Sequence, residues 1–385
     1  MRLKKLLLLS SFFLLLLHAR AQDSCELRIS LLTCSPGEEL YSTFGHTALR
    51  VQNMQTGSDH VYNYGSFEFG PDFYTKFIKG KLLYFLSVED MNDFMYQYQM
   101  EGRGVQEQVL QLNCGEKTRL LQALRVNADE QNRYYRYDFL FDNCTTRAGD
   151  MVAAHTDTPV VFNNILPAET PSFRNLLHTY LDKGKQPWSK LGIDILLGSR
   201  LDRKVTNEEA MFLPDYLLKG FDKARINERP LVSAPATILD STIDLKKNSW
   251  FTPSMVFSIV LLLIILLSFS SRAWAAGILR IFDFIWFFIL GLAGLLLLFM
   301  WFGTDHTVCR DNLNLLWALP THIVAAVFVR SEKKWVKSYF RVVMWLSIVL
   351  ALTWFILPQQ MNNALLPVLF LTILRSWKLS KTKHA

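Results

Sequence analysis

Cys144 and His46 are the two residues whose types and positions favour chemistry. Cys144 stands where a polar turn meets the expected start of a helix. A thiol there is stabilised as thiolate, because the N-terminal end of a helix carries partial positive charge and free amide donors. His46 follows Gly45 at the start of an expected strand, so its ring can project from the strand end. A thiolate beside an imidazole is an activated nucleophile for acyl transfer.

Each of the two residues also has a purely structural interpretation. A lone cysteine before a helix is more often inert, and a lone histidine on a strand is more often packed or hydrogen-bonded. The other candidate nucleophiles are weaker, because Cys25, Cys34 and Cys114 are expected at strand ends and the chain has no G-x-S-x-G motif. Cys309 is a candidate second thiol centre, although no helix start or paired histidine there is as convincing.

A third group should orient the imidazole. The strand expected at 60–65 pairs with the His46 strand through a polar turn, which brings Asn63 or Tyr64 beside the ring. Asn63 is the preferred residue, because its amide oxygen accepts a hydrogen bond from the ring and stays uncharged. A shift of one residue in the strand register would exchange it for Tyr64.

Strands lead and helices follow in residues 22–250, an order typical of α+β domains. The expected strands are Glu26–Thr33, Gly45–Met54, His60–Gly65, Lys81–Val88 and Val105–Leu112. The expected helices are Pro71–Gly80, Lys117–Ala128, Thr145–Ala154 and one opened by a capping box at Thr206–Glu209.

Residues 1–21 have the pattern of a secretory signal peptide: a basic start, an apolar run from Leu6 to Leu17, and small residues before the expected mature start near Gln22. An uncleaved anchor is the alternative, although this apolar run is short for a bilayer span of about 20 residues. We therefore expect residues 22–250 to form an exported, periplasmic domain.

Residues 251–385 contain five apolar stretches of near-spanning length, which predict an α-helical membrane domain. They are Ser254–Phe269, Phe282–Phe302, Leu313–Val329, Val342–Leu357 and Ala364–Trp377. Lys and Arg follow the first, third and fifth stretches, whereas the 358–363 loop is uncharged. Because basic residues collect on the cytoplasmic side, we expect a multi-pass protein of the inner membrane with a cytoplasmic C-terminus.

The net charge of +7 is largely this topological signal. The sequence has no basic-aromatic recognition motif, so a nucleic-acid partner is not expected. No C-x-x-C, H-E-x-x-H or zinc-spaced cluster is present, so no metal and no cofactor are expected. The oxidising periplasm permits a disulfide, for which Cys34 and Cys114 are one pairing and Cys25 is a competing partner.

His306 and Arg310 lie in the loop between the second and third apolar stretches. Ordinary interfacial polarity is one explanation. The other is a surface that binds a head group or a lipoprotein below the catalytic cleft, since a cation such as Arg310 suits phosphate.

Four segments resemble the lipoprotein N-acyltransferase family of Bacteroidetes, Lnb. They are FGHTALRV at 44–51, YNYG at 62–65, DFLFDNCTTR at 138–147 and NLNLLW at 312–317. The resemblance covers almost the whole expected mature chain. Its exported part is similar to circularly permuted NlpC/P60 papain-like proteins, among them lecithin:retinol acyltransferase, in which a strand histidine precedes a helix-start cysteine.

This resemblance implies a permuted papain-like α+β domain followed by a five-span membrane domain, and it implies a reaction. His46 would deprotonate Cys144, which would take an acyl chain from a membrane phospholipid as a thioester. The α-amino group of a diacylglyceryl-cysteine lipoprotein would then accept the chain. The implied partners are thus a phospholipid donor, diacylated lipoproteins and the membrane.

Two other functions remain open. A peptidoglycan-cleaving NlpC/P60-type cysteine endopeptidase would use the same pair, although it has no need of five spans. A non-catalytic membrane transport or binding protein would instead use the polar residues Asp283 and His322 inside the membrane, although five spans without a visible repeat make a poor transporter.

Overall fold

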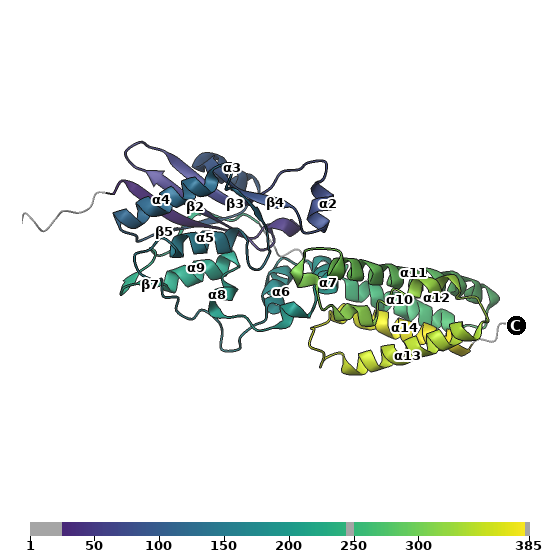
Figure 1. Cartoon of the computed structure of the whole chain (residues 1–385). Helices are drawn as coiled ribbons and strands as arrows, with labels where there is room; N and C mark the ends of the chain where they lie inside the picture. Colours follow the sequence, from purple (N-terminus) through teal and green to yellow (C-terminus); the bar gives the residue numbers. More distant parts are fainter. Residues whose placement is uncertain (1–24, 244–249, 382–385) are drawn as a thin grey trace, which may run out of the picture.

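The computed structural model describes residues 25–243 and 250–381. They form an α+β part and a helical part that lie end to end (Figure 1). The predicted signal peptide and the mature start near Gln22 lie outside the described residues.

The α+β part is built on a seven-stranded antiparallel sheet in the order β6-β4-β3-β2-β1-β5-β9. The strands are β1 Leu27–Cys34, β2 His46–Asn53, β3 Asp59–Ser66, β4 Leu83–Asp90, β5 Val105–Val109, β6 Tyr134–Arg136 and β9 Ala236–Leu239. The five longest follow the predicted strands closely. The two outer strands have only three and four residues, too short for an alternating pattern to be recognised.

Helices cover both faces of the sheet. On one face, α4 (Cys114–Ala128), α5 (Cys144–Ala153) and α9 (Pro214–Lys223) share a buried core with Leu31 and Leu49. On the other face, α3 (Met91–Met100) packs against Leu32 and Ala48. Side chains of neighbouring strand residues thus point into cores on opposite faces of the sheet, as the pleat of a strand requires.

Smaller elements complete the α+β part. They are η2 Leu40–Ser42, α2 Phe73–Ile78, α6 Phe173–Lys183, α7 Pro187–Leu196, η3 Ser199–Asp202, α8 Asn207–Ala210 and the hairpin of β7 Arg225–Ile226 with β8 Arg229–Pro230. The predicted capping box is confirmed, because the Thr206 side chain and Glu209 satisfy each other's backbone amides at the start of α8.

The helical part contains α10 Pro253–Ser268, α11 Ala273–Phe302, α12 His322–Val327, α13 Lys334–Thr353 and α14 Leu366–Lys381, with short turns η4 Thr307–Cys309, η5 Leu313–Leu316 and η6 Asn363–Leu365. Within the described residues, only α11 and α13 are both long and apolar enough to cross a membrane.

The prediction of five regular spanning helices is therefore only partly supported. Helices α10 and α14 have 16 residues each, which is short for a span. The third predicted stretch is not one helix, because η5 and the six-residue α12 are separated by irregular chain around Pro320. A proline ring prevents a regular helix from running through that point.

A buried polar network joins the two parts at Asp194 of α7. Its carboxylate accepts from Arg174 Nη1, His178 Nε2 and Asn362 Nδ2, each at 2.8 Å. Its backbone oxygen accepts from Asn314 Nδ2 at 2.9 Å. Because a buried charge is costly without all its partners, this network fixes the α+β part against the loops of the helical part.

Of the pairings that the sequence left open, the structure has Cys25 with Cys114, whose Cα atoms lie 5.3 Å apart, and not Cys34 with Cys114. The reason is the antiparallel pairing of β1 and β5. Cys34 at the end of β1 faces Val105 at the start of β5, so Cys114, which follows β5, lies beside the start of β1, next to Cys25.

Candidate active site

Cys144 is the first residue of α5, and the residue before it builds this helix start. The Asn143 side chain accepts from the Thr145 and Thr146 amides at 2.8 and 2.9 Å, and Thr146 Oγ1 accepts from the Asn143 amide at 2.9 Å. This reciprocal cap satisfies donors that a helix start leaves free. It fixes the backbone on which the thiol stands.

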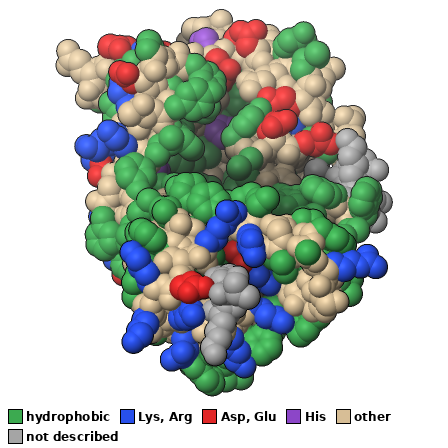
Figure 2. Space-filling view, turned by 90° about the vertical axis from the view of Figure 1, so that its right-hand side faces the viewer, with side chains coloured by type: hydrophobic (Ala, Val, Ile, Leu, Met, Phe, Trp, Pro, Cys, Tyr) green, Lys and Arg blue, Asp and Glu red, His purple; other side chains and the backbone are tan. Residues whose placement is uncertain are grey.

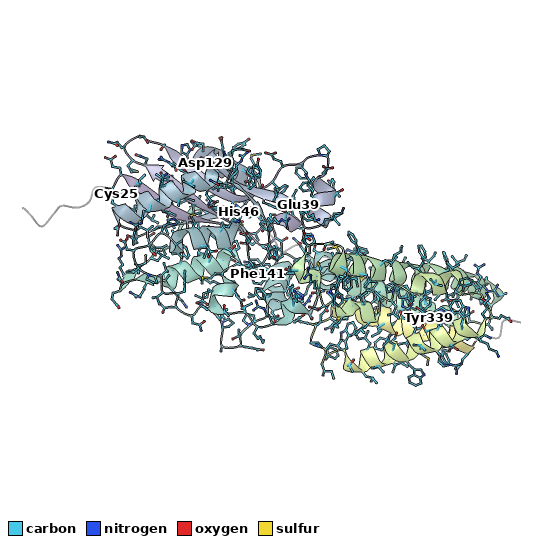
Figure 3. The ribbon with its side chains drawn as sticks, in the orientation of Figure 1. Cys25, Glu39, His46, Asp129, Phe141 and Tyr339 are labelled. Carbon is cyan, nitrogen blue, oxygen red and sulfur yellow. A yellow bond between two sulfur atoms is a disulfide. The ribbon has the colours of Figure 1, made fainter. Side chains whose placement is uncertain are left out.

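The start of helix α5 is hydrogen-bonded to the start of strand β2. Thr145 Oγ1 donates to Thr47 Oγ1 at 3.2 Å, and the Cys144 thiol lies 3.7 Å from Thr145 Oγ1. These contacts bring the start of α5 to the strand that begins with His46 (Figure 3). In the same view Phe141, three residues before Cys144, lies on the side of the α+β part that borders the helical part.

The electrostatics of the pair favour a reactive thiol. Burial by itself would raise the pKa of Cys144, but the charge and hydrogen bond of His46, the Thr47 amide and the Thr145 hydroxyl lower it to about 7. Burial would likewise lower the pKa of His46, but Cys144 and the hydrogen bond with Asn63 raise it above its ordinary value. Each partner thus stabilises the charged form of the other.

The other free cysteines within the described residues are different. Burial raises the pKa of Cys34 to about 12 and that of Cys309 to about 11. Both remain neutral thiols near pH 7 and are poor nucleophiles. Of these free thiols, Cys144 is therefore the one with a lowered pKa.

Asn63 and not Tyr64 touches the imidazole. His46 Nε2 lies 2.6 Å from Asn63 Oδ1, whereas the Tyr64 hydroxyl donates to Asn127 Oδ1 at 3.2 Å. Because a carboxamide oxygen only accepts, Nε2 carries the proton and Nδ1 is left as the basic nitrogen. The sequence missed Glu89, whose Oε1 accepts from Asn63 Nδ2 at 2.8 Å and so fixes the orientation of the amide.

Tyr135 on β6 is a second residue that sequence reasoning missed. Its buried hydroxyl has no hydrogen-bond partner among the described side chains; burial raises its pKa, and a backbone hydrogen bond with Gly65 lowers it in part. A Cβ atom placed on Gly65 would lie 4.0 Å from this hydroxyl and 3.4 Å from the Cys144 Cβ, so both groups border the same glycine. Gly65 has a φ of 90°, a conformation that glycine adopts without strain. Gly65 belongs to the YNYG segment at 62–65, which stands out in the sequence. Strand β6 is too short to be recognised in the sequence, so Tyr135 could not be placed beside this glycine.

His306 and Arg310 lie where the helical part meets the α+β part. His306 Nε2 lies 3.0 Å from the backbone oxygen of Phe77, next to α2. The backbone oxygen of Arg310 packs against Gly198, and its half-buried side chain has no ion pair with any residue that the structure describes. No hydrogen bond within the described ranges joins either residue to Cys144 or His46.

Across residues 25–243 and 250–381, no three His, Cys, Asp or Glu side chains gather as a metal site would require. The candidate chemistry therefore depends on the thiol, the imidazole and their hydrogen-bond partners.

Comparison with known protein families assigns the chain. Residues 18–178 match the Lnb N-terminal periplasmic domain, and residues 245–384 match the Lnb transmembrane domain. No curated protein and no solved structure matches the chain. The two matches agree with the division into an α+β part and a helical part, and together they cover most of the sequence. The chain belongs to the Lnb family, as a membrane protein with an exported N-terminal domain.

Proposed function

We propose that this protein is a lipoprotein N-acyltransferase that uses Cys144 as nucleophile and His46 as base. The observation that carries the proposal is the lowered pKa of Cys144, about 7, beside a histidine whose tautomer Asn63 fixes. A thiol with this pKa is about half thiolate at pH 7, and the thiolate attacks acyl carbon readily. Membership of the Lnb family supports lipoproteins as the substrate class.

The reaction has two halves. In the first, His46 Nδ1 holds the proton of Cys144 while the thiolate attacks the carbonyl carbon of a phospholipid ester. The tetrahedral intermediate expels the lysophospholipid alkoxide, which takes the proton from His46 and leaves an acyl-thioester. In the second, the neutral α-amine of a diacylglyceryl-cysteine attacks the thioester, His46 removes the amine proton, and Cys144 leaves as thiolate. The product is a triacylated lipoprotein with an amide bond.

Both halves pass through an oxyanion that needs hydrogen-bond donors. The backbone amide of Cys144, in the first turn of α5, is one proposed donor. The Tyr135 hydroxyl is the second: burial raises its pKa, so it keeps its proton, and no described side chain uses it. We assign it to the developing oxyanion.

The fold of the exported domain is proposed to be the permuted papain-like one. The order of a strand histidine before a helix-start cysteine, with the helix packed on an antiparallel sheet, supports this.

The helical part is proposed to cross the inner membrane five times, with α10, the η5–α12 segment and α14 as its less regular spans. Lys and Arg side chains gather around the end of the helical part that lies far from the α+β part (Figure 2). This distribution supports a cytoplasmic C-terminus and a periplasmic active site. Arg310, at the opposite end, is proposed to contact the donor phosphate.

The two alternative functions explain less. An endopeptidase would use Cys144 and His46 but not the buried network that fixes the α+β part to the helical part. In a transporter, the Asp283 and His322 side chains would have to be free to bind the transported substrate or ion. Instead, the Asp283 carboxylate makes two 2.7 Å hydrogen bonds with Arg375, and His322 binds Tyr339 and the Trp317 backbone. The polar side-chain atoms of both residues thus form their hydrogen bonds within the helical part.

Reconstitution tests the proposal. The full chain is placed in liposomes with a diacylated lipoprotein, and mass spectrometry measures the N-terminal peptide. We expect one added acyl chain with the parent protein and none with Cys144→Ser. A lipoprotein that stays diacylated with active, folded parent protein would contradict the proposal, and release of peptide from peptidoglycan would favour the endopeptidase.

A further inference from the structure

Exposed aromatic side chains gather at α2 and the turn before it. Phe69, Tyr74 and Phe77 are 75%, 71% and 50% exposed, and none of the residues of α2 is buried. A soluble surface rarely presents such a cluster without a partner. The segment from Phe67 to Lys81, hereafter the α2 segment, therefore faces an environment other than bulk water.

The α2 segment is bonded to the helical part just beyond the end of α11. The Asp305 amide donates to the Lys79 oxygen at 2.9 Å, and His306 Nε2 contacts the Phe77 oxygen at 3.0 Å. Helix α11 ends at Phe302, which is 75% exposed. Because α11 is long and apolar enough to span a bilayer, the α2 segment lies at the level where that span leaves the membrane.

The charges of the segment fit a phospholipid surface. Lys76, Lys79 and Lys81 stand among its aromatic residues and outnumber Glu68 and Asp72, and of the three lysines Lys76 is paired with Asp72 at 4.0 Å. Aromatic rings prefer the boundary between acyl chains and head groups, and neighbouring cations reach the phosphates. Aromatic and basic groups together thus match one leaflet of a membrane.

A row of aromatic contacts runs from the α2 segment to the nucleophile. Ring centroids are 4.5 Å apart for Phe69 and Phe73, 5.4 Å for Phe69 and Phe67, 5.5 Å for Phe67 and Tyr84, and 4.4 Å for Tyr84 and Tyr137. Tyr137 borders Gly65, as the Cys144 Cβ does. Above the helical part, hydrophobic side chains also border a hollow in the α+β part (Figure 2). A continuous row of ring contacts therefore connects the exposed cluster with the neighbourhood of Cys144.

We propose that the α2 segment rests in the periplasmic leaflet and that its aromatic row guides the acyl chain of a phospholipid from that leaflet to Cys144. This assigns the donor's path and rests on the proposed function. In this proposal the exposed side chains of the α2 segment contact lipid and not a protein partner.

Membrane contact is tested with spin labels at two matched tyrosines. Tyr74→Cys lies in the α2 segment. Tyr96→Cys, 64% exposed on α3, is the control, because α3 lies on the sheet face remote from the helical part. Each is labelled in full-length Cys144→Ala protein in phosphatidylcholine–phosphatidylglycerol nanodiscs. We expect the ratio of oxygen to nickel-chelate accessibility to be several-fold higher at position 74, since oxygen concentrates in lipid. Equal ratios would overturn the proposal and would favour a protein partner.

The path is tested by charge substitutions at exposed positions, which leave the core intact. Phe69→Asp with Tyr74→Asp is compared with Tyr96→Asp in the full chain. Thioester formation on Cys144 from bilayer phospholipid should fall at least tenfold in the double variant only, and thioester formation from a water-soluble p-nitrophenyl butyrate should match the parent in all variants. A double variant as fast as the parent on bilayers would refute the path and leave the proposed function intact. Absence of thioester from phospholipid in the parent itself would instead refute the proposed function, and the spin-label ratios would still decide the membrane contact.

Discussion

The Nε2 atom of His46 lies 2.6 Å from Oδ1 of Asn63 on the neighbouring strand. This bond directs the other ring nitrogen to the thiol of Cys144. Asn63 is itself held by Glu89, 2.8 Å away. The orientation of the imidazole beside Cys144 therefore depends on Asn63 and, through it, on Glu89.

Asn63→Ala should lower acyl transfer by about tenfold or more, because an imidazole without its acceptor samples the wrong tautomer and orientation. Tyr64→Phe is the matched control, since its hydroxyl binds Asn127 and not the ring. The readout is the rate of acyl transfer together with the rate of Cys144 alkylation. Equal loss in both variants would assign the effect to the strand and not to the imidazole contact.

The rate of Cys144 alkylation should rise with pH around a midpoint near 7. The sign follows from the lowered pKa of about 7: the reactive thiolate predominates above this pH and is lost as pH falls below it. In His46→Ala the partner charge is gone and burial dominates, so the midpoint should move upward. Alkylation by iodoacetamide across pH 5–10, read by mass spectrometry, measures both. A parent midpoint at about 8.5, the value of an ordinary thiol, would contradict the pair.

Tyr135→Phe should lower the rate of thioester formation by about 10²-fold, the typical effect of losing one oxyanion donor. The alkylation midpoint of Cys144 should stay within a few tenths of a unit, because alkylation forms no oxyanion. An unchanged rate of thioester formation would remove Tyr135 from the mechanism.

Cys25→Ser should destabilise the exported domain by about 2–4 kcal/mol, since the lost bridge closes a long loop. Cys34→Ser serves as the comparison, because Cys34 is a buried free thiol and not a disulfide partner. Thermal unfolding with and without reductant reports the difference. Reductant should lower the unfolding temperature of the parent and of Cys34→Ser and leave Cys25→Ser unchanged; an effect on Cys25→Ser but not on Cys34→Ser would show that the assigned bridge is wrong.

The candidate pair and its strands could be predicted because their signals are local. A glycine before His46, a polar cap before Cys144 and alternating apolar residues along β1 to β4 are each visible within about ten residues of sequence. Asn63 was preferred to Tyr64 on chemical grounds, and the strand register then brought Asn63 to the ring.

The rest depends on contacts between distant segments. Cys114 meets Cys25 only because β5 runs antiparallel to β1, and Tyr135 reaches Gly65 from a strand of three residues. Hydropathy located the third apolar stretch but averaged over the break at Pro320, where a proline ring stops a regular helix. The contact of the turns there with Gly294, which lies directly against Ala318 and Pro320, joins distant segments and could not be predicted.

Mass spectrometry of Cys144 itself tests the central claim most directly. The full chain is incubated in liposomes that contain one phospholipid of defined acyl composition, without lipoprotein, and the peptide that carries Cys144 is analysed. Our account predicts the mass of that acyl chain on Cys144, its removal by neutral hydroxylamine, and its disappearance when a diacylated lipoprotein is added. Lipoprotein N-acylation that proceeds at the same rate with Cys144 unacylated throughout, or in Cys144→Ser, would contradict it.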